Sequence, residues 1–184
     1  MAALFLLWTA VASSTAVAQL PAATAQIEPG LLARALAGNA EAAIGVGDAY
    51  AKAEGRAQDC RQAAAWYEKS AGIAGDLRLA ALYRDGCRTL PRDMAQAAAW
   101  YAKAAELGDV TAQGTLGTLY FFGQGVAQNY AEAYFWLDLA AHEPGPRQQQ
   151  YAQNRQFAGA HITADEVEAA HERLEAWLYN HHRK

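Results

Sequence analysis

Residues 108–141 read GDVTAQGTLGTLYFFGQGVAQNYAEAYFWLDLAA, and this stretch decides the fold. Its apolar residues recur with helical spacing on both sides of a turn that contains Gly123 and Gly125, which predicts two short amphipathic helices. Weaker copies of the stretch occur twice upstream. The aromatic residues that mark the three copies are Tyr50 and Trp66, Tyr83 and Trp100, and Tyr120 and Trp136.

The second helix of each copy has its own start signal. Each begins after an Asp or Asn that is followed three residues later by Gln or Glu, which is the pattern of a capping box. In that motif the two side chains satisfy backbone amide groups reciprocally. The pairs are Asp59 with Gln62, Asp93 with Gln96, and Asn129 with Glu132.

A period in the mid-thirties with two helices per unit predicts an α-solenoid, in which stacked units bury surfaces that no single unit can cover. Small residues three positions before each repeat tyrosine, namely Gly47, Ala80 and Gly117, allow the two helices of a unit to approach closely. The repeat tryptophans are expected to fill the space between layers.

The third copy resembles the Sel1-like repeat, a relative of the tetratricopeptide repeat, over about residues 38–141. The residues that carry the resemblance are Leu116, Gly117, Leu119, Tyr120, Gly123, Gly125, Val126, Asn129, Ala133, Trp136, Ala140 and Ala141. The first unit lacks a glycine pair in its turn, at Ala53 to Gly55. The second has Gly86 and Cys87 in the turn and a first helix that reads as shortened.

These observations predict an all-α fold, a short right-handed α-solenoid of about three helix-turn-helix repeats with capping helices at both ends. The repeat domain is expected at residues 29–141, with a partial unit at 29–37 and full units at 38–74, 75–107 and 108–141. Residues 142–184 are expected to form the C-terminal capping helices. A capping box at Thr163 and Glu166 opens the last of them.

The first 18 residues have the pattern of a secretory signal. An uncharged apolar run from Ala2 ends in the small residues Ala16 to Ala18, although no Lys or Arg precedes it. A second small-x-small site at Ala23 to Ala25 allows cleavage as late as residue 25, and residues 19–28 read as a flexible leader. The run is short for a transmembrane helix. We therefore expect a periplasmic or secreted protein with no membrane insertion after cleavage; an uncleaved anchor is the alternative.

The chain has two cysteines, Cys60 just after the capping Asp59 and Cys87 in the turn of the second unit. Both map to one edge of the solenoid in consecutive layers about 10 Å apart, a gap that loop residues can close for a disulfide. An even number of cysteines in an exported protein favours pairing. Two free buried thiols and a redox switch remain alternatives.

The charge pattern and the motifs argue against nucleic-acid binding and catalysis. The net charge is −4, and the basic residues are scattered rather than clustered. The string from His171 to Glu175 resembles half of a zinc-protease helix but has Glu where the second histidine should stand, so we interpret it as an exposed helix face. The residues from His181 to Lys184 read as a frayed tail. No metal or other cofactor is expected.

Some relatives of the repeat family are linked to β-lactam binding and weak hydrolysis, so the resemblance keeps that enzyme activity as an alternative. The only serine after the predicted signal is Ser70, and no Ser-x-x-Lys motif occurs. We therefore expect a protein that is not an enzyme.

Residues that depart from the repeat pattern are the better candidates for binding, because the fold does not require them. They lie at the ends of the predicted first helices and are Lys52, Arg84, Asp85, Phe121 and Phe122. First helices line the concave side of such solenoids, where extended segments bind. The hypothesis is a monomeric, exported adaptor for a protein or peptide partner. The alternative function is an envelope regulator that uses Cys60 and Cys87. The alternative role for one of the two phenylalanines is packing under the C-terminal helices.

Overall fold

The computed structural model describes residues 27–52 and 58–181. The predicted signal and the turn from Ala53 to Gly55 lie outside these residues. The described residues form nine helices: α1 (Pro29–Leu36), α2 (Ala40–Lys52), α3 (Cys60–Ser70), α4 (Ile73–Asp85), α5 (Met94–Glu106), α6 (Val110–Phe122), α7 (Tyr130–His142), α8 (Gln148–Gly159) and α9 (Ala164–His181). None of them is long and apolar enough to cross a membrane.

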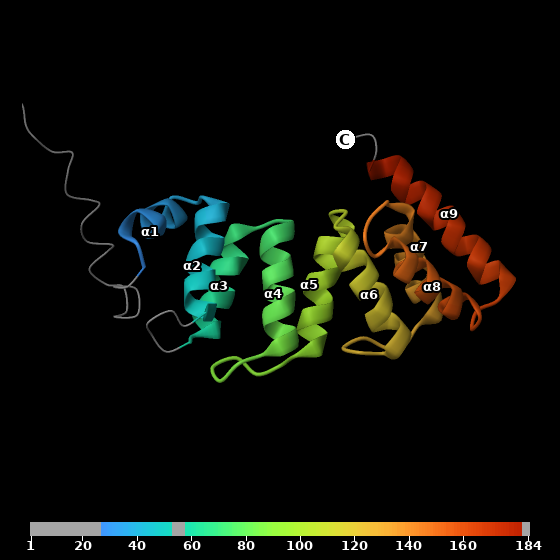
Figure 1. Ribbon diagram of the computed structural model, residues 1–184, viewed down its shortest axis with the longest axis horizontal. Helices are drawn as coiled ribbons and strands as arrows, with labels where there is room; N and C mark the ends of the chain where they lie inside the picture. Colours follow the sequence, from blue (N-terminus) through green and yellow to red (C-terminus); the bar gives the residue numbers. More distant parts are fainter. Residues whose placement is uncertain (1–26, 53–57, 182–184) are drawn as a thin grey trace, which may run out of the picture.

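The helices pack in the order of the chain, so that the molecule is a row of helical layers (Figure 1). The pairs α2 with α3, α4 with α5, and α6 with α7 form the three repeat units, and each pair also packs against its neighbours in the row. Helix α1 covers the N-terminal end, while α8 and α9 pack on α7 at the other end. The predicted solenoid of three repeats is therefore confirmed.

The capping residues of the second helices behave only partly as predicted. The side chains of Asp59, Asp93 and Asn129 do accept hydrogen bonds from backbone amides in the first turns of α3, α5 and α7. The predicted reciprocal bond, from the backbone amide of each capping residue to the Gln or Glu side chain three residues later, does not form. That amide donates instead to the backbone carbonyl of a repeat tyrosine. The donors and acceptors are Asp59 and Tyr50 at 3.1 Å, Asp93 and Tyr83 at 2.8 Å, and Asn129 and Tyr120 at 3.0 Å.

These three bonds tie the end of each first helix to the start of the second helix in the same unit. The full box does form at α9, where the amide of Thr163 donates to the Glu166 carboxylate at 2.8 Å and the amide of Glu166 donates to the Thr163 hydroxyl at 3.3 Å. Thr163 lies outside the repeat units, so its amide does not bond to the end of a first helix and donates to the Glu166 side chain instead.

The close approach of paired helices is confirmed at the predicted small residues. A methyl group added at Gly117 would lie 2.7 Å from Leu137 Cγ, and one at Gly47 would lie 2.5 Å from a ring carbon of Tyr67. Ala80 is fully buried at the equivalent position. The prediction that the first helix of the second unit is shortened is wrong, because α2, α4 and α6 each have 13 residues. Helix α4 reaches that length because it begins at Ile73, directly after Gly72.

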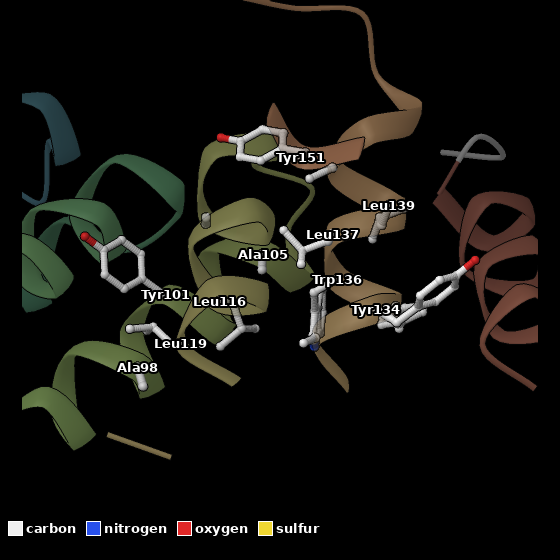
Figure 2. Packing of buried hydrophobic residues seen from close by; sticks show 14 of the residues in the cluster. Ala98, Tyr101, Ala105, Leu116, Leu119, Tyr134, Trp136, Leu137, Leu139 and Tyr151 are labelled. Carbon is white, nitrogen blue, oxygen red and sulfur yellow. The ribbon is translucent and has the colours of Figure 1, made fainter. Parts of the chain in front are cut away.

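The core consists of two clusters of buried side chains, one over α1, α2 and α3 with Leu79 of α4, and the other from Ala80 of α4 through α5, α6 and α7 to the C-terminal cap. Figure 2 shows part of the second cluster, with Ala98, Tyr101 and Ala105 of α5 near residues of α6 and α7. Tyr83 and Trp100 pack against both clusters and join them. Trp66 and Trp136 are each only 5% exposed, while Trp100 is half-buried with the Lys103 ammonium 3.5 Å from its ring centre. The expected packing role of the tryptophans is confirmed.

Helix α9 also contacts the solenoid through its polar face, whose residues His171, Arg173 and Glu175 are exposed as predicted. The Arg173 guanidinium pairs with the Glu132 carboxylate at 2.6 Å and lies 3.8 Å from the ring centre of Phe135. The prediction of a frayed tail is wrong for His181, whose ring stacks on Trp177 and whose Nε2 lies 3.0 Å from the Glu106 carbonyl oxygen. Residues 182–184 lie outside the described part of the chain.

Candidate partner-binding face

The residues predicted to bind a partner occupy repeat-equivalent positions. Lys52, Asp85 and Phe122 are the last residues of α2, α4 and α6, and Arg84 and Phe121 precede two of them. We call the surface formed by the C-terminal halves of α2, α4, α6 and α8 the first-helix face. One groove of this face lies between α2 and α4, and another lies between α6 and α8.

A repeat position on the second helices forms the floor of this face. The residue after each repeat tryptophan is Tyr67 on α3, Tyr101 on α5 and Leu137 on α7. The hydroxyl groups of the first two form hydrogen bonds with side chains of the first helices. The Tyr67 hydroxyl donates to Asp48, and the Tyr101 hydroxyl accepts from Arg84. Leu137 offers only an apolar surface. The chemistry of the face therefore changes along the row from polar to apolar.

The groove between α6 and α8 is an apolar pocket of about 240 Å³. Its lining residues are Thr118, Phe121 and Phe122 of α6, Leu137 of α7, and Asn154 and Phe157 of α8. Two of its aromatic rings stand in solvent, because Phe122 is 61% exposed and Phe157 is 64% exposed. Such a pair of large exposed apolar side chains beside a pocket is typical of an interaction site.

The two adjacent phenylalanines have different roles. Phe121 is half-buried against the core, and its ring makes edge contacts with Tyr130 at 5.3 Å and with Phe122 at 5.0 Å between ring centres. His161, in the turn before α9, stacks on Tyr130 at 4.4 Å. The alternative in which one phenylalanine packs under the C-terminal segment therefore holds for Phe121, while Phe122 projects outward.

Phe157 is the pocket residue that the sequence did not reveal. It lies on α8, which reads as a polar helix from its glutamines and asparagine. The only signal was an isolated aromatic residue near the end of that helix. Its meaning depends on how α8 packs beside α6, which is a contact between elements that no local pattern contains.

The groove between α2 and α4 is polar and is organised around Asp48. This carboxylate accepts hydrogen bonds from the Tyr67 hydroxyl at 2.7 Å and from Arg78 Nη1 at 2.8 Å, and Lys52 Nζ lies 3.9 Å away. Its side chain is 19% exposed, whereas that of Lys52 is 61% exposed. Burial raises the pKa of the Tyr67 hydroxyl, and its hydrogen bond to Asp48 raises it further.

Arg84 and Asp85 neutralise each other at the end of α4, where Asp85 is also part of the lining of the polar groove. The guanidinium donates two hydrogen bonds to the carboxylate, at 2.8 and 3.0 Å, and a third to the Tyr101 hydroxyl at 3.0 Å. The hydrogen bond from Arg84 lowers the pKa of the Asp85 carboxyl group. Both residues lie at the end of α4, where the sequence places them, and their charges are held in a bidentate pair.

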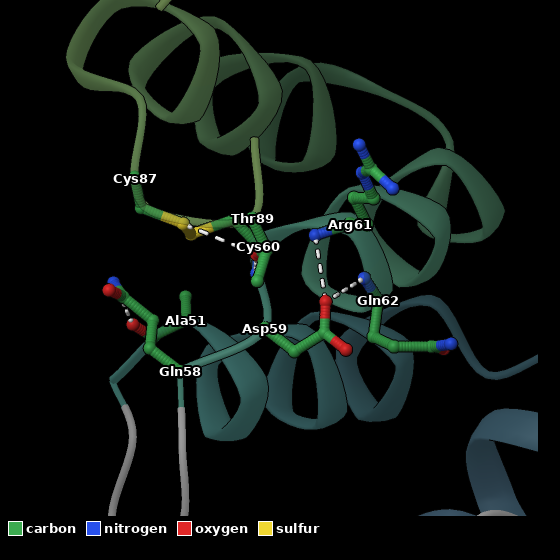
Figure 3. Close-up of a disulfide and its surroundings, with 8 residues drawn as sticks. All are labelled: Ala51, Gln58, Asp59, Cys60, Arg61, Gln62, Cys87 and Thr89. Carbon is green, nitrogen blue, oxygen red and sulfur yellow. Dashed lines mark hydrogen bonds between the residues drawn. A yellow bond between two sulfur atoms is a disulfide. The ribbon is translucent and has the colours of Figure 1, made fainter. Parts of the chain in front are cut away.

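The predicted pairing of the cysteines is present, with Cys60 bonded to Cys87 and 6.5 Å between their α-carbons (Figure 3). Cys60 is fully buried at the start of α3, and Cys87 lies in the loop between α4 and α5. The Thr89 hydroxyl accepts a hydrogen bond from the Cys60 amide at 2.9 Å and lies 3.5 Å from Cys87 Sγ. Both cysteines are therefore paired in this structure.

A second polar cluster joins the C-terminal cap to α7. Asp138 is nearly buried and pairs with Arg155 of α8 at 2.5 Å and with His171 of α9 at 3.4 Å. The hydroxyl of Tyr134 lies 3.0 Å from the same His171 nitrogen, Nε2. These contacts join α7, α8 and α9.

Two further features bear on catalysis, namely the surroundings of Ser70 and the grouping of the side chains that could bind a metal ion. Ser70 is buried, and its hydroxyl donates to the Tyr67 carbonyl at 2.6 Å, so it is not placed as a nucleophile. Within residues 27–52 and 58–181, no group of three or more His, Cys, Asp or Glu side chains is placed to hold a metal ion.

A family model for the Sel1 repeat matches residues 40–72, 74–109 and 111–143. The chain belongs to the Sel1 repeat family. The three matched segments correspond, to within a residue, to the helix pairs α2 with α3, α4 with α5, and α6 with α7. Sel1 repeats typically mediate protein interactions.

Two solved structures are similar to this Sel1 repeat protein. One is a Sel1 repeat protein from Oxalobacter formigenes, with 26% identity and a TM-score of 0.58, and the match covers 68% of this chain and 96% of that one. The other is a protective antigen present in uropathogenic Escherichia coli strains, with 25% identity and a TM-score of 0.52. That match covers 81% of this chain and 40% of the antigen. The comparison with curated proteins gives no match.

Proposed function

We propose that this Sel1 repeat protein is a non-catalytic adaptor that binds a segment of a partner protein along its first-helix face. The observation that carries the proposal is the apolar pocket between α6 and α8, with the exposed rings of Phe122 and Phe157 at its sides. A solvent-exposed aromatic pair is costly to keep in water unless a partner covers it, and aromatic side chains are the usual anchors of protein interfaces.

The size of the pocket supports a side-chain anchor. At about 240 Å³ it is smaller than the clefts of roughly 300–1,000 Å³ that hold drug-sized molecules. It suits one aromatic or large aliphatic side chain, whose burial contributes about 1.5–3 kcal/mol. Leu137 at its floor and the rings of Phe122 and Phe157 would surround such a side chain with carbon atoms.

We further propose that the adaptor works outside the cytoplasm, in the periplasm or as a secreted monomer. Two observations support this location. Residues 1–18 have the pattern of a secretory signal. The disulfide between Cys60 and Cys87 is of the kind that persists in oxidising compartments.

Site-specific photocrosslinking in intact cells tests the adaptor role. A benzophenone side chain placed at position 122 is expected to give one dominant protein adduct in the envelope or secreted fraction. Leu36 on α1 is the matched control position, because it is an exposed apolar residue at the opposite end of the solenoid. Equal adduct patterns from positions 122 and 36, or none from position 122, would contradict the proposal.

The disulfide also supports a second candidate, an envelope regulator whose partner binding depends on redox state. Cys60 is fully buried, but Cys87 lies in a half-buried loop that a thiol reagent can approach. Loss of the adduct at position 122 on mild reduction, with the fold retained by circular dichroism, would favour this role. An adduct that survives reduction would favour a purely structural bridge.

A further inference from the structure

The chemistry of the partner segment follows from the charges that surround the polar groove. We propose that the first-helix face binds an acidic peptide segment, in which one large apolar side chain enters the pocket between α6 and α8 and an Asp or Glu side chain reaches Lys52 and Arg78 between α2 and α4. This inference rests on the proposed adaptor function and adds the composition and spacing of the bound segment.

The cations of the polar groove have unused hydrogen-bonding capacity. Asp48 is the shared acceptor beneath them, and it takes only one N–H bond from the Arg78 guanidinium, which has five donors. Lys52 Nζ is 3.9 Å from Asp48 and largely exposed, so its ammonium can turn toward a second carboxylate. Arg78 is also about half exposed at its side chain.

The balance of charge at the polar groove differs from that of the whole chain. The charged residues in and beside this groove are Asp48, Asp85, Lys52, Arg78 and Arg84, which sum to one positive charge, while the chain carries −4. The Asp85 side chain is 63% exposed, but its charge is paired with that of Arg84. Asp48 is only 19% exposed and lies beneath two cations, Lys52 and Arg78, so the unbalanced charge presented to solvent is positive. A carboxylate is the complementary ligand.

The layered fold sets the spacing between the two contacts. The groove between α2 and α4 and the pocket between α6 and α8 are separated by two layers, which is about 20 Å at a helix spacing of about 10 Å. An extended segment rises about 3.3 Å per residue, so the apolar anchor and the carboxylate should stand about six residues apart. Arg84 of α4 and Tyr101 of α5, which are hydrogen-bonded to each other, follow the polar groove along the row and offer polar contacts to the connecting backbone.

A peptide selection on the folded, disulfide-bonded protein tests this inference. The probe is a phage-displayed library of random peptides about 16 residues long, which in extended form can span both grooves. We expect enriched peptides to contain a large apolar residue with an Asp or Glu about six positions away. Their affinities are then measured by fluorescence polarisation with the full chain.

A charge swap distinguishes binding at the polar groove from a general effect of charge. Lys52→Glu is expected to weaken the selected peptides about tenfold, and replacing the peptide carboxylate with lysine should restore affinity for this variant. Arg61→Glu is the matched control, since Arg61 is an exposed cation at the start of α3 and away from the lining of both grooves. Lys52→Gln, which adds no charge beside Asp48, should give a smaller loss in the same direction.

The outcomes separate this inference from the function on which it rests. Peptides that need Phe122 but show no acidic preference and bind Lys52→Glu normally would overturn the inference and leave the adaptor function standing. A selection that yields no peptide dependent on Phe122 would overturn both.

Discussion

Reducing the bond between Cys60 and Cys87 should destabilise the N-terminal half of the solenoid. The two cysteines are 27 residues apart in sequence. In the chain-entropy treatment of disulfides, closing a loop of that length stabilises the folded state by about 3.5 kcal/mol. For a domain of this size each kcal/mol corresponds to roughly 2–4 °C in Tm, so reduction should lower the Tm by about 7–14 °C.

The assay is thermal unfolding followed by circular dichroism with and without reductant, together with hydrogen exchange read by helix. The bond links the start of α3 to the loop after α4, so protection should fall first in α2, α3 and α4. Helices α6 and α7 lie in the other core cluster and should keep their protection. Units of a solenoid contact chiefly their neighbours, which is why the effect should be local.

The double variant Cys60→Ala, Cys87→Ala is the control, because reductant should leave its Tm unchanged. A Tm that falls by less than about 2 °C on complete reduction would refute the reasoning, since it corresponds to less than about 1 kcal/mol. Equal loss of protection in α2 and α7 would show that the bond does not act on the first two units in particular.

Three further perturbations test the packing. Gly117→Ala should lower the free energy of unfolding in urea by about 1–3 kcal/mol, because the added methyl would lie 2.7 Å from a side chain on the facing helix. The control Gly145→Ala, whose added methyl would have no atom within 4 Å, should change it by less than about 0.5 kcal/mol. Arg173→Ala should cost about 1 kcal/mol by removing a half-exposed ion pair and a ring contact; no difference from the exposed control Glu175→Ala would count against this role. Burial raises the pKa of Tyr67 above its usual value of about 10, so the unfolded chain loses this proton first and stability should decline as the pH rises above about 10. Tyr67→Phe should flatten that decline, and an unchanged pH slope in the variant would rule Tyr67 out as its source.

The repeat architecture could be predicted from the sequence because it depends on local, periodic signals. The spacing of Trp66, Trp100 and Trp136 and the small residues at Gly47 and Gly117 report helix faces and close helix pairs, and the structure has both. The position of the two cysteines also followed from the repeat, since equivalent turns lie at one edge.

The details that failed depend on contacts between elements. The predicted reciprocal capping boxes do not form, because the amide of Asp59 and its equivalents already bonds to the carbonyl of a repeat tyrosine across the turn. The exposed face predicted around His171 is correct, although the contacts that His171 and Arg173 also make with α7 are not visible in the sequence of their own helix. Phe157 joins the pocket only because α8 packs beside α6.

The most direct test of the binding face is the affinity of a selected peptide for the wild-type protein and for Phe122→Ala. Phe122 is 61% exposed, so its truncation should leave the Tm nearly unchanged. If its ring forms the pocket wall for an anchor side chain, affinity should fall at least tenfold, since truncation of such a contact costs about 2 kcal/mol or more. Leu36→Ala should bind as the wild type does. Equal affinity of Phe122→Ala and wild type would contradict the claim that this pocket holds the partner.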